Sequence, residues 1–344
     1  IVDLRSDTVT VPTSKMRQVM KDAEVGDDGF GEDPNTNRFE KMAAERLGKE
    51  DALFVPSGIM GNLIAIMVHT KPGDGLICDR KAHINTMVAG NTSALTGTTI
   101  CPLDADETGH LNLEELESLI NLDDVRFPRT SLIVLENTNN LAGGTVVTPE
   151  ETAKIYKIAE RYGLRLHLDG ARIFNSAIFQ GVDVAELAGD CDSIMFCLSK
   201  GLASPVGSII AGTKEFIKEA RRRRKMLGGS MRQTGILASC GIVSLEEMIN
   251  RLAEDHDNAK YLANGLVEIE GFSIKLKTVQ TNIVCFRYEL PNLSCREFVE
   301  NVGKKGVYVV YLEKNYGRMV THKDLNRSDV GYALEVFKKT VSEC

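Results

Sequence analysis

Seven short, nearly all-apolar segments separated by amphipathic stretches constrain the fold more than any other feature of the chain. They read "DALFV", "GLICD", "TTICPL", "SLIVLEN", "LRLHLD", "DSIMFCLS" and "GSIIAG". Strands that are apolar on both faces are typical of a sheet covered by helices on both sides, and stretches such as "PEETAKIYKIAERYG" have a helical pattern. The sequence therefore predicts an α/β fold with a mostly parallel, seven-stranded sheet between helices.

The pattern changes in the last third of the chain. A long helical segment, "TGILASCGIVSLEEMINRLAEDHDNAKYLANGLVEI", is followed by the expected strands "FSIKLK", "TNIVCFRY" and "GVYVVYL" and by a last helix capped by Asn326 or Ser328. A chain of 344 residues is long enough for two domains. We therefore predict a large domain over residues 1–245, including an N-terminal arm, and a small α+β domain over 246–344, with a cleft between them.

Composition narrows the class of protein. The formal net charge of -7 argues against a nucleic-acid partner, and no apolar stretch approaches the ~20 residues of a membrane span. The eight cysteines form no CxxC pair and no signal peptide opens the chain, so we expect a cytoplasmic protein. The histidines lack metal-ligand spacing, so no metal site is expected. We expect the basic run from Arg221 to Lys225 to form one solvated helix face.

The segment "FVPSGIMGN" joins a strand to a helix through Ser57, Gly58 and Ile59. The free N–H groups at the start of a helix favour an anion such as a phosphate. An ordinary strand-turn-helix connection explains this segment equally well. It is neither a Walker loop nor GxGxxG, so a dehydrogenase is not favoured.

Two other segments place charged residues just after apolar strands. Asp169 ends the strand in "LHLDGARIF", and Lys200 follows "MFCLS". A buried carboxylate needs a cation, for which Arg172 and the protonated ring nitrogen of a cofactor are both candidates. We expect His167 to lie in the core or behind the site. His83, after "GLICD", is expected at the same edge of the sheet because parallel strands share a direction.

These groups together match one cofactor. Pyridoxal phosphate requires a lysine for the Schiff base, an acid for the pyridinium nitrogen and a phosphate site. The motifs "DLRSDTVT", "GEDP", "FVPSGIMGN", "FPRTSLIVLENT", "LHLDGARIFN", "MFCLSKGLASPVGS", "RKMLGGSMRQ" and "VTHKD" follow one another along nearly the whole chain. In these motifs the chain resembles the low-specificity L-threonine aldolases of the aromatic-amino-acid β-eliminating lyase group, which are pyridoxal-phosphate enzymes of fold type I.

The resemblance implies a role for each matching residue. Lys200 would form the Schiff base, Asp169 would keep the pyridinium nitrogen protonated, and His83 would stack on the ring. Lys225 and Arg232 would reach the phosphate of a neighbouring subunit in a homo-oligomer, a dimer of dimers. The residues implied to bind the cofactor are Ser57, Gly58, Ile59, His83, Asp169, Arg172, Lys200, Lys225 and Arg232, and those implied to be catalytic are Lys200, His83, Asp169 and Arg172.

The substrate implied by the resemblance is a small amino acid. Ser6, Arg172 and Arg318 would bind its carboxylate, with Arg172 also near the phenolic oxygen of the cofactor. L-Threonine, L-allo-threonine and related β-hydroxy-α-amino acids would be cleaved to glycine and an aldehyde. This reaction needs a base for the proton of the β-hydroxyl group.

The sequence departs from the family pattern where that base is expected. Asn139 stands in "ENTNN" where the family usually has histidine, and Phe30 stands where tyrosine is common. Residues 85–88, "NTMV", replace an aromatic pair and a glutamate. The chain therefore either remains an aldolase, with His83 or a water as base, or has diverged to racemisation, transamination, β-elimination or a transaldol reaction. A cofactor-binding protein without catalysis is least favoured, because the lysine, the aspartate and both arginines are retained.

Overall fold

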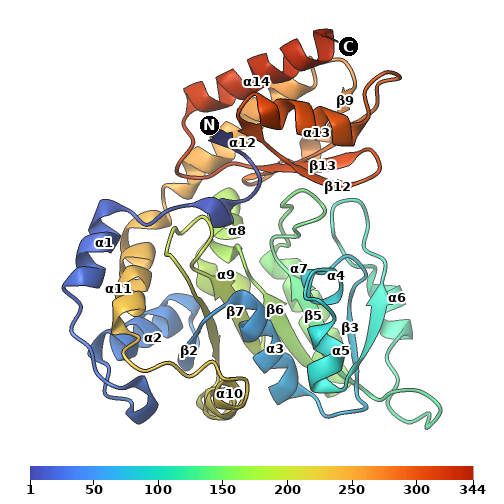
Figure 1. Ribbon diagram of the computed structural model, residues 1–344. Helices are drawn as coiled ribbons and strands as arrows, with labels where there is room; N and C mark the ends of the chain where they lie inside the picture. The colour runs from blue at the N-terminus through green and yellow to red at the C-terminus, as the bar shows by residue number, and fades with distance from the viewer. Residues whose placement is uncertain (344) are drawn as a thin grey trace.

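A computed structural model describes residues 1–343, and a seven-stranded sheet lies at the centre of its larger part (Figure 1). Its strand order is β2-β8-β7-β6-β5-β3-β4. Strand β8 is antiparallel to both of its neighbours, and the remaining pairs are parallel. The predicted mostly parallel sheet is therefore confirmed. Its strands are β2 (Asp51–Val55), β3 (Gly75–Asp79), β4 (Thr99–Leu103), β5 (Thr130–Glu136), β6 (Arg165–Asp169), β7 (Ser193–Cys197) and β8 (Ser208–Gly212).

Helices cover both faces of this sheet, because successive residues of each strand point to opposite sides. On β7, Ile194 and Phe196 pack in the main core with α2, α7 and α8, whereas Met195 and Cys197 pack under α3 and α10. The helices are α1 (Ser14–Lys21), α2 (Pro34–Leu47), α3 (Gly58–His69), α4 (His83–Thr86), α5 (Asn91–Thr96), α6 (Leu113–Ser118), α7 (Pro149–Arg161), α8 (Ile173–Gln180), α9 (Val184–Ala188), α10 (Lys214–Met226), α11 (Gly235–Val243), α12 (Leu252–Leu266), α13 (Cys295–Lys304) and α14 (Arg327–Ser342).

The C-terminal part has its own apolar core under a four-stranded sheet. The strand order is β12 (Val310–Glu313), β13 (Tyr316–Val320), β10 (Ile283–Tyr288) and β9 (Phe272–Ser273), and helices α12, α13 and α14 pack against it. Asn326 caps α14 through a capping box, as one of the two predicted caps. The expected strand "FSIKLK" is wrong beyond Ser273, because Thr278 turns back to donate to the carbonyl of Lys275.

The N-terminal arm connects the two cores. Strand β1 (Val2–Asp3) pairs with β11 (Val307–Tyr308), and Leu4 packs in the C-terminal core (Figure 1). The arm then crosses to the large sheet, where α1 packs against α11. The long predicted helical segment runs as α11, a π-helical turn over Ser244–Met248 and α12. The domain boundary between residues 245 and 246 stays a prediction.

The basic run does not form one solvated face, so that expectation is wrong. Arg224 is buried, where it donates to Asp28 at 2.6 Å and to the carbonyl of Phe54 at 2.7 Å. Arg221 pairs with the buried Glu40 at 2.5 Å. These arginines lie three residues apart on the side of α10 that packs against the protein, where buried carboxylates need a counter-charge. Within residues 1–343, no helix combines the length and the apolar character needed to span a membrane.

Candidate active site

Three neighbouring strands of the large sheet end in a buried acidic residue. Asp79 ends β3, Glu136 ends β5 and Asp169 ends β6, and the last two are paired in register. No residue among those that the structure describes forms an ion pair with any of the three. Burial of a carboxyl group without a cation is costly, so this edge of the sheet favours a positively charged ligand.

Asp169 is held by two neutral donors. Its Oδ2 accepts a hydrogen bond from the Asn62 amide at 2.6 Å, and its Oδ1 accepts one from the backbone N–H of Ala171 at 3.1 Å. The carboxylate is only 2% exposed. Arg172, one of its two candidate partners, binds Asp7 instead. A protonated ring nitrogen would therefore supply the positive counter-charge that Asp169 lacks.

Lys200 lies in the turn that follows β7. The turn is fixed by its backbone, since the Lys200 carbonyl accepts hydrogen bonds from the Thr10 hydroxyl at 3.0 Å and from the Ala203 N–H at 2.9 Å. The lysine forms no ion pair within residues 1–343, and its charge acts on Asp7 and His83. The structure thus brings the amine to the edge of the sheet that carries the acidic residues.

Arg172 forms a buried ion pair with Asp7, a residue that sequence reasoning missed. Its Nε donates to Asp7 Oδ2 and its Nη2 to Oδ1, both at 2.7 Å, and the two side chains are 6% and 0% exposed. Asn282 donates to the same carboxylate at 3.2 Å. Burial alone would raise the pKa of Asp7, but the Arg172 guanidinium outweighs it and holds that pKa well below its usual value. Ser6 lies beside this pair, where it caps the turn of Asp7–Val9 by accepting from Thr8 N–H.

Arg318, on β13 of the C-terminal part, has no carboxylate partner among the described residues. Its Nη1 donates to the Asn140 side-chain oxygen at 2.7 Å, and its buried Nε has no hydrogen-bond partner there. Burial, and then the nearby Arg172, lower the pKa of Arg318. A half-buried guanidinium with free donors is suited to a carboxylate ligand.

Glu136 connects the segments that carry His83 and Asn140. Its two oxygens accept the backbone N–H groups of His83 at 2.7 Å and of Asn140 at 2.8 Å. Burial, aided by Asp169, raises the pKa of Glu136 to about 7. The pKa of His83 is lowered by burial and by Lys200 and the nearby arginines, although Asp169 opposes this shift.

The start of α3 fits a phosphate group. Ser57 caps the helix by accepting from Met60 N–H at 3.2 Å, and the first N–H groups of a helix have no partner within it. A Cβ atom on Gly58 would lie 2.7 Å from Cys197 Sγ, so only glycine fits here without a shift. Ile59 is 42% exposed. Lys225 and Arg232 are also exposed, and their predicted reach to a neighbouring subunit stays a prediction.

Comparison with known proteins identifies the family. The chain matches the beta-eliminating lyase family over residues 3–289. The chain belongs to this family. Low-specificity L-threonine aldolase 1 of Arabidopsis thaliana is 41% identical over 344 residues, which cover 99% of this chain and 96% of that protein. The low specificity L-threonine aldolase of Escherichia coli strain K12 is 40% identical over 335 residues, which cover 96% of each. The resemblance found in the sequence is thereby confirmed.

Solved structures of other proteins show the same fold. The threonine aldolase of Leishmania major superposes with a TM-score of 0.85 at 20% identity and covers 99% of this chain and 100% of that chain. A putative L-allo-threonine aldolase of Listeria monocytogenes gives a TM-score of 0.80 at 21% identity, with 98% and 96% covered. The predicted fold type I architecture is confirmed.

In this beta-eliminating lyase, the residue in place of the family's histidine has a structural role. The buried Asn139 donates to Asp79 at 3.3 Å and accepts from the backbone N–H of Ala142 at 3.0 Å, which closes the turn that leads to Thr145. Val88 is buried, and Phe30 is 77% exposed. None of these side chains can accept a proton near neutral pH.

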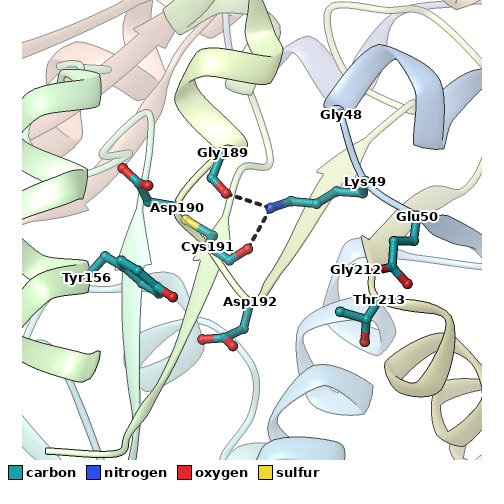
Figure 2. Close-up of a pocket in the computed structure, with 10 residues that line it drawn as sticks. All are labelled: Gly48, Lys49, Glu50, Tyr156, Gly189, Asp190, Cys191, Asp192, Gly212 and Thr213. Atoms are coloured by element: carbon teal, nitrogen blue, oxygen red, sulfur yellow. Dashed lines mark hydrogen bonds between the residues drawn. The ribbon is translucent and has the colours of Figure 1, made fainter. Parts of the chain in front are cut away.

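A separate cleft of ≈320 Å³ lies at the opposite edge of the sheet, where β2 and β7 begin and β8 ends (Figure 2). Within it, the Lys49 ammonium group donates to the carbonyls of Gly189 at 3.1 Å and Cys191 at 2.6 Å. Lys49 therefore closes the end of α9, and we assign the cleft no role in catalysis. Across residues 1–343, no group of three or more His, Cys, Asp or Glu side chains is arranged to hold a metal ion.

Proposed function

We propose that this chain is a pyridoxal-phosphate-dependent carbon–carbon lyase that cleaves L-threonine, L-allo-threonine and related β-hydroxy-α-amino acids to glycine and an aldehyde. The proposal rests on one observation above all, which is a buried carboxylate and a half-buried guanidinium that both lack a partner of opposite charge among the described residues. Asp169 lacks a cation, Arg318 lacks a carboxylate, and the charges of both act on His83 together with that of Lys200. The names of its relatives as low-specificity L-threonine aldolases support the same activity.

The cofactor side of the site is formed by the ends of the parallel strands. Lys200 would hold the aldehyde carbon of the cofactor through its amine, and Asp169 would accept the ring N–H. Ser57 and the first turn of α3 would hold the phosphate, and His83 would lie against the ring. When bound, pyridoxal phosphate supplies a ring that accepts the electron pair of a breaking bond at the α-carbon.

The substrate side is formed by the two arginines. Arg318 would make the main ion pair with the substrate carboxylate, because its donors are not committed to an acid. Arg172 already gives two donors to Asp7, so only its remaining N–H groups are available. Ser6, next to Asp7 in the N-terminal arm, would add a hydroxyl donor. Binding of the carboxylate would thus orient the amino acid and neutralise the positive charge of Arg318.

The proton of the β-hydroxyl group needs an acceptor. Since burial and the nearby cations lower the pKa of His83, its imidazole is neutral at pH 7 and can accept a proton directly or through a water. Asn139 cannot accept it, and its amide is bound to Asp79. We infer that His83 replaces the base that the family's histidine would provide.

We further propose that the active form is a homo-oligomer, a dimer of dimers, in the cytoplasm. The exposed Lys225 and Arg232 support this, because the Arg232 side chain contacts a carboxylate only at 3.5 Å, that of Asp27, within residues 1–343. The free cysteines between Cys78 and Cys295 support a reducing location. Sedimentation of the active enzyme tests the assembly, and full activity of a monomer would contradict it.

The reaction is tested with purified holoenzyme and L-threonine or L-allo-threonine. Acetaldehyde is followed with a coupled dehydrogenase, and amino-acid products are identified by chromatography. Lys200→Ala should lose both turnover and the visible absorbance of the bound cofactor. Arg318→Gln should keep the absorbance and raise KM about tenfold or more, since a charge-assisted hydrogen bond is lost.

The matched control is Arg296→Gln, which removes an exposed arginine that pairs with Glu300 on the surface. It should leave KM unchanged. Absence of acetaldehyde above the Lys200→Ala background would contradict the aldolase assignment. Formation of D-threonine, a keto acid or an elimination product would instead identify one of the diverged reactions.

A further inference from the structure

We propose that a chain of four neutral side chains, three of them buried and one half-buried, positions and polarises the Asp169 carboxylate. The chain, here called the Asp169 relay, consists of His69, Ser193, His167 and Asn62. Its members are positioning residues, because only Asp169 would touch the cofactor. The catalytic consequence rests on the proposed function, whereas the hydrogen-bonded chain is a property of the folded protein alone.

The fold brings these residues together from three elements. His167 and Asp169 are two residues apart on β6 and therefore share one face of the sheet. Ser193 on β7 is the registered neighbour of His167. Asn62 and His69 are seven residues apart on α3, which is about two turns and thus on one side of that helix. Helix α3 packs over this face of β6 and β7.

The contacts form an unbroken path. The Asn62 amide nitrogen lies 2.6 Å from Asp169 Oδ2, and its oxygen lies 3.0 Å from His167 Nε2. His167 Nδ1 is 2.8 Å from Ser193 Oγ, which in turn is 2.7 Å from His69 Nε2. Asn62, His167 and Ser193 are 3%, 0% and 0% exposed. Such a path through the interior has no solvent to replace a missing partner.

The donors and acceptors can be assigned in only one direction. Because a carboxylate cannot donate, the Asn62 N–H group must point at Asp169, and the Asn62 oxygen must then accept from His167 Nε2–H. A neutral His167 accepts at Nδ1 from the Ser193 hydroxyl, whose oxygen accepts from His69 Nε2–H. Burial keeps both rings neutral, since it lowers the pKa of His167 to about 3 and that of His69 to about 4. Every hydrogen in the relay therefore points toward Asp169.

This direction has a chemical consequence. Aligned hydrogen bonds strengthen one another, so the bonds behind Asn62 polarise the N–H group that it directs at Asp169. An arginine or lysine in the place of Asn62 would also stabilise the carboxylate, but it would cancel its charge. The neutral relay instead leaves the negative charge of Asp169 available for a protonated ring nitrogen.

At the end of the relay that is farthest from Asp169, the His69 ring packs against an aromatic side chain. The His69 ring stacks on Phe216 with 4.9 Å between ring centroids and an angle of 18° between planes. Arg165 and Asp192 are the charged groups that act on this histidine. They lie at the edge of the sheet opposite to Asp169, so the relay extends along β6 from its end toward its beginning.

The test compares two cofactor analogues on the apoenzyme. Pyridoxal phosphate and its analogue with carbon in place of the ring nitrogen are titrated by absorbance into the wild type, Asn62→Leu and Ser193→Ala. Asn62→Leu should weaken pyridoxal phosphate about tenfold or more, because it removes a hydrogen bond to a charged group, and should leave the analogue unchanged. Ser193→Ala, which keeps the contact between Asn62 and Asp169, should show a smaller loss of the same selectivity.

The control is Ser239→Ala, a buried serine that donates to a carbonyl within α11 and lies outside the relay. It should bind both compounds as the wild type does. Equal loss of both compounds in the two relay variants, or no loss in either, would overturn the relay. Failure of the wild type to bind pyridoxal phosphate would overturn the proposed function instead.

A second measurement needs no cofactor. In apoenzyme with ¹⁵N-labelled histidine, NMR should find His69 and His167 as neutral rings protonated at Nε2 at pH 7. Ser193→Ala should shift the ring signals of both histidines, and Ser239→Ala should shift neither. A ring protonated at Nδ1, or a charged ring, would reverse a bond of the assigned path and overturn the proposal.

Discussion

The buried pair of Asp7 and Arg172 allows a stability effect to be calculated. Asp7→Asn keeps the volume of the side chain but removes its charge, and so leaves the Arg172 guanidinium uncompensated in the interior, near Arg318. Removal of one partner of a buried ion pair costs about 3–5 kcal/mol. For a chain of 344 residues the entropy of unfolding is roughly 0.7 kcal/mol/K, so the melting temperature should fall by roughly 4–7 °C.

The matched control lies in the same arm of the chain. Asp3 binds Arg5 through the same two-pronged contact, but the arginine side chain is 52% exposed. Exposed pairs contribute about 0–1 kcal/mol, so Asp3→Asn should shift the melting temperature by roughly 1.5 °C or less. Calorimetry on the apoenzyme at a fixed protein concentration measures both. Equal shifts for the two variants would refute the reasoning.

The pH dependence of the difference in melting temperature between the wild type and Asp7→Asn gives an independent check. Since Arg172 depresses the pKa of Asp7 in the folded state, the contribution of the pair is complete above the unfolded pKa and is lost only as the pH falls below it. The difference in melting temperature between the wild type and Asp7→Asn should therefore be the same at pH 5 and pH 8. A difference that disappears at pH 5 would mean that Asp7 is protonated there.

Two further predictions concern the cofactor cradle and Glu136. Gly58→Ala places a Cβ atom 2.7 Å from Cys197 Sγ and should weaken the binding of pyridoxal phosphate in an absorbance titration. Cys197→Ala in the same chain should largely restore the affinity. A double variant that binds no better than Gly58→Ala would contradict this explanation. Because burial raises the pKa of Glu136 to about 7, its contribution to stability is present at low pH and is lost as the pH rises from about 4.5 to 7. Glu136→Gln should flatten the fall in melting temperature across this range, and an unchanged slope would contradict the assignment.

The cofactor side of the site could be predicted from the sequence because its residues lie at or just after the ends of strands. A strand that is apolar on both faces marks its own end by its first charged residue, and parallel strands bring such residues to one edge. Asp169 and Lys200 were found in this way. Asp79 and Glu136 carry the same signal, in "GLICD" and "SLIVLEN", and it identifies them as well once the sheet is assumed.

The substrate side could not be predicted from local patterns. Asp7 lies in an arm without a repeating pattern, and it meets Arg172 only because β1 is anchored on the C-terminal part. Arg318 lies on β13, where Gly317 and the charged side chain interrupt the alternation that indicates a strand, so only its motif resemblance singled it out. Contacts between distant segments decided these positions, and no short window of sequence contains them.

The residues of the Asp169 relay show which contacts the periodicity of the sequence can predict and which it cannot. The spacing of His167 and Asp169 predicts a shared face of a strand, and the spacing of Asn62 and His69 predicts a shared side of a helix. Neither spacing says which helix covers which pair of strands. That choice depends on the strand order, in which β6 and β7 are neighbours below α3. The polar residues on these two surfaces become partners only after the sheet is assembled.

The charges of the site explain why one edge of the sheet suits both a cationic ring and an anionic carboxylate. On the cofactor side, Asp169 is stabilised by neutral donors and keeps its negative charge for a cationic ring. On the substrate side, Asp7 compensates Arg172, so that only Arg318 keeps its positive charge for a carboxylate. If Asp7 were neutral, two adjacent arginines would compete for the substrate and attract other anions. The buried pair therefore leaves one of the two arginines without a carboxylate partner among the described residues, which matches the one carboxylate of an amino acid.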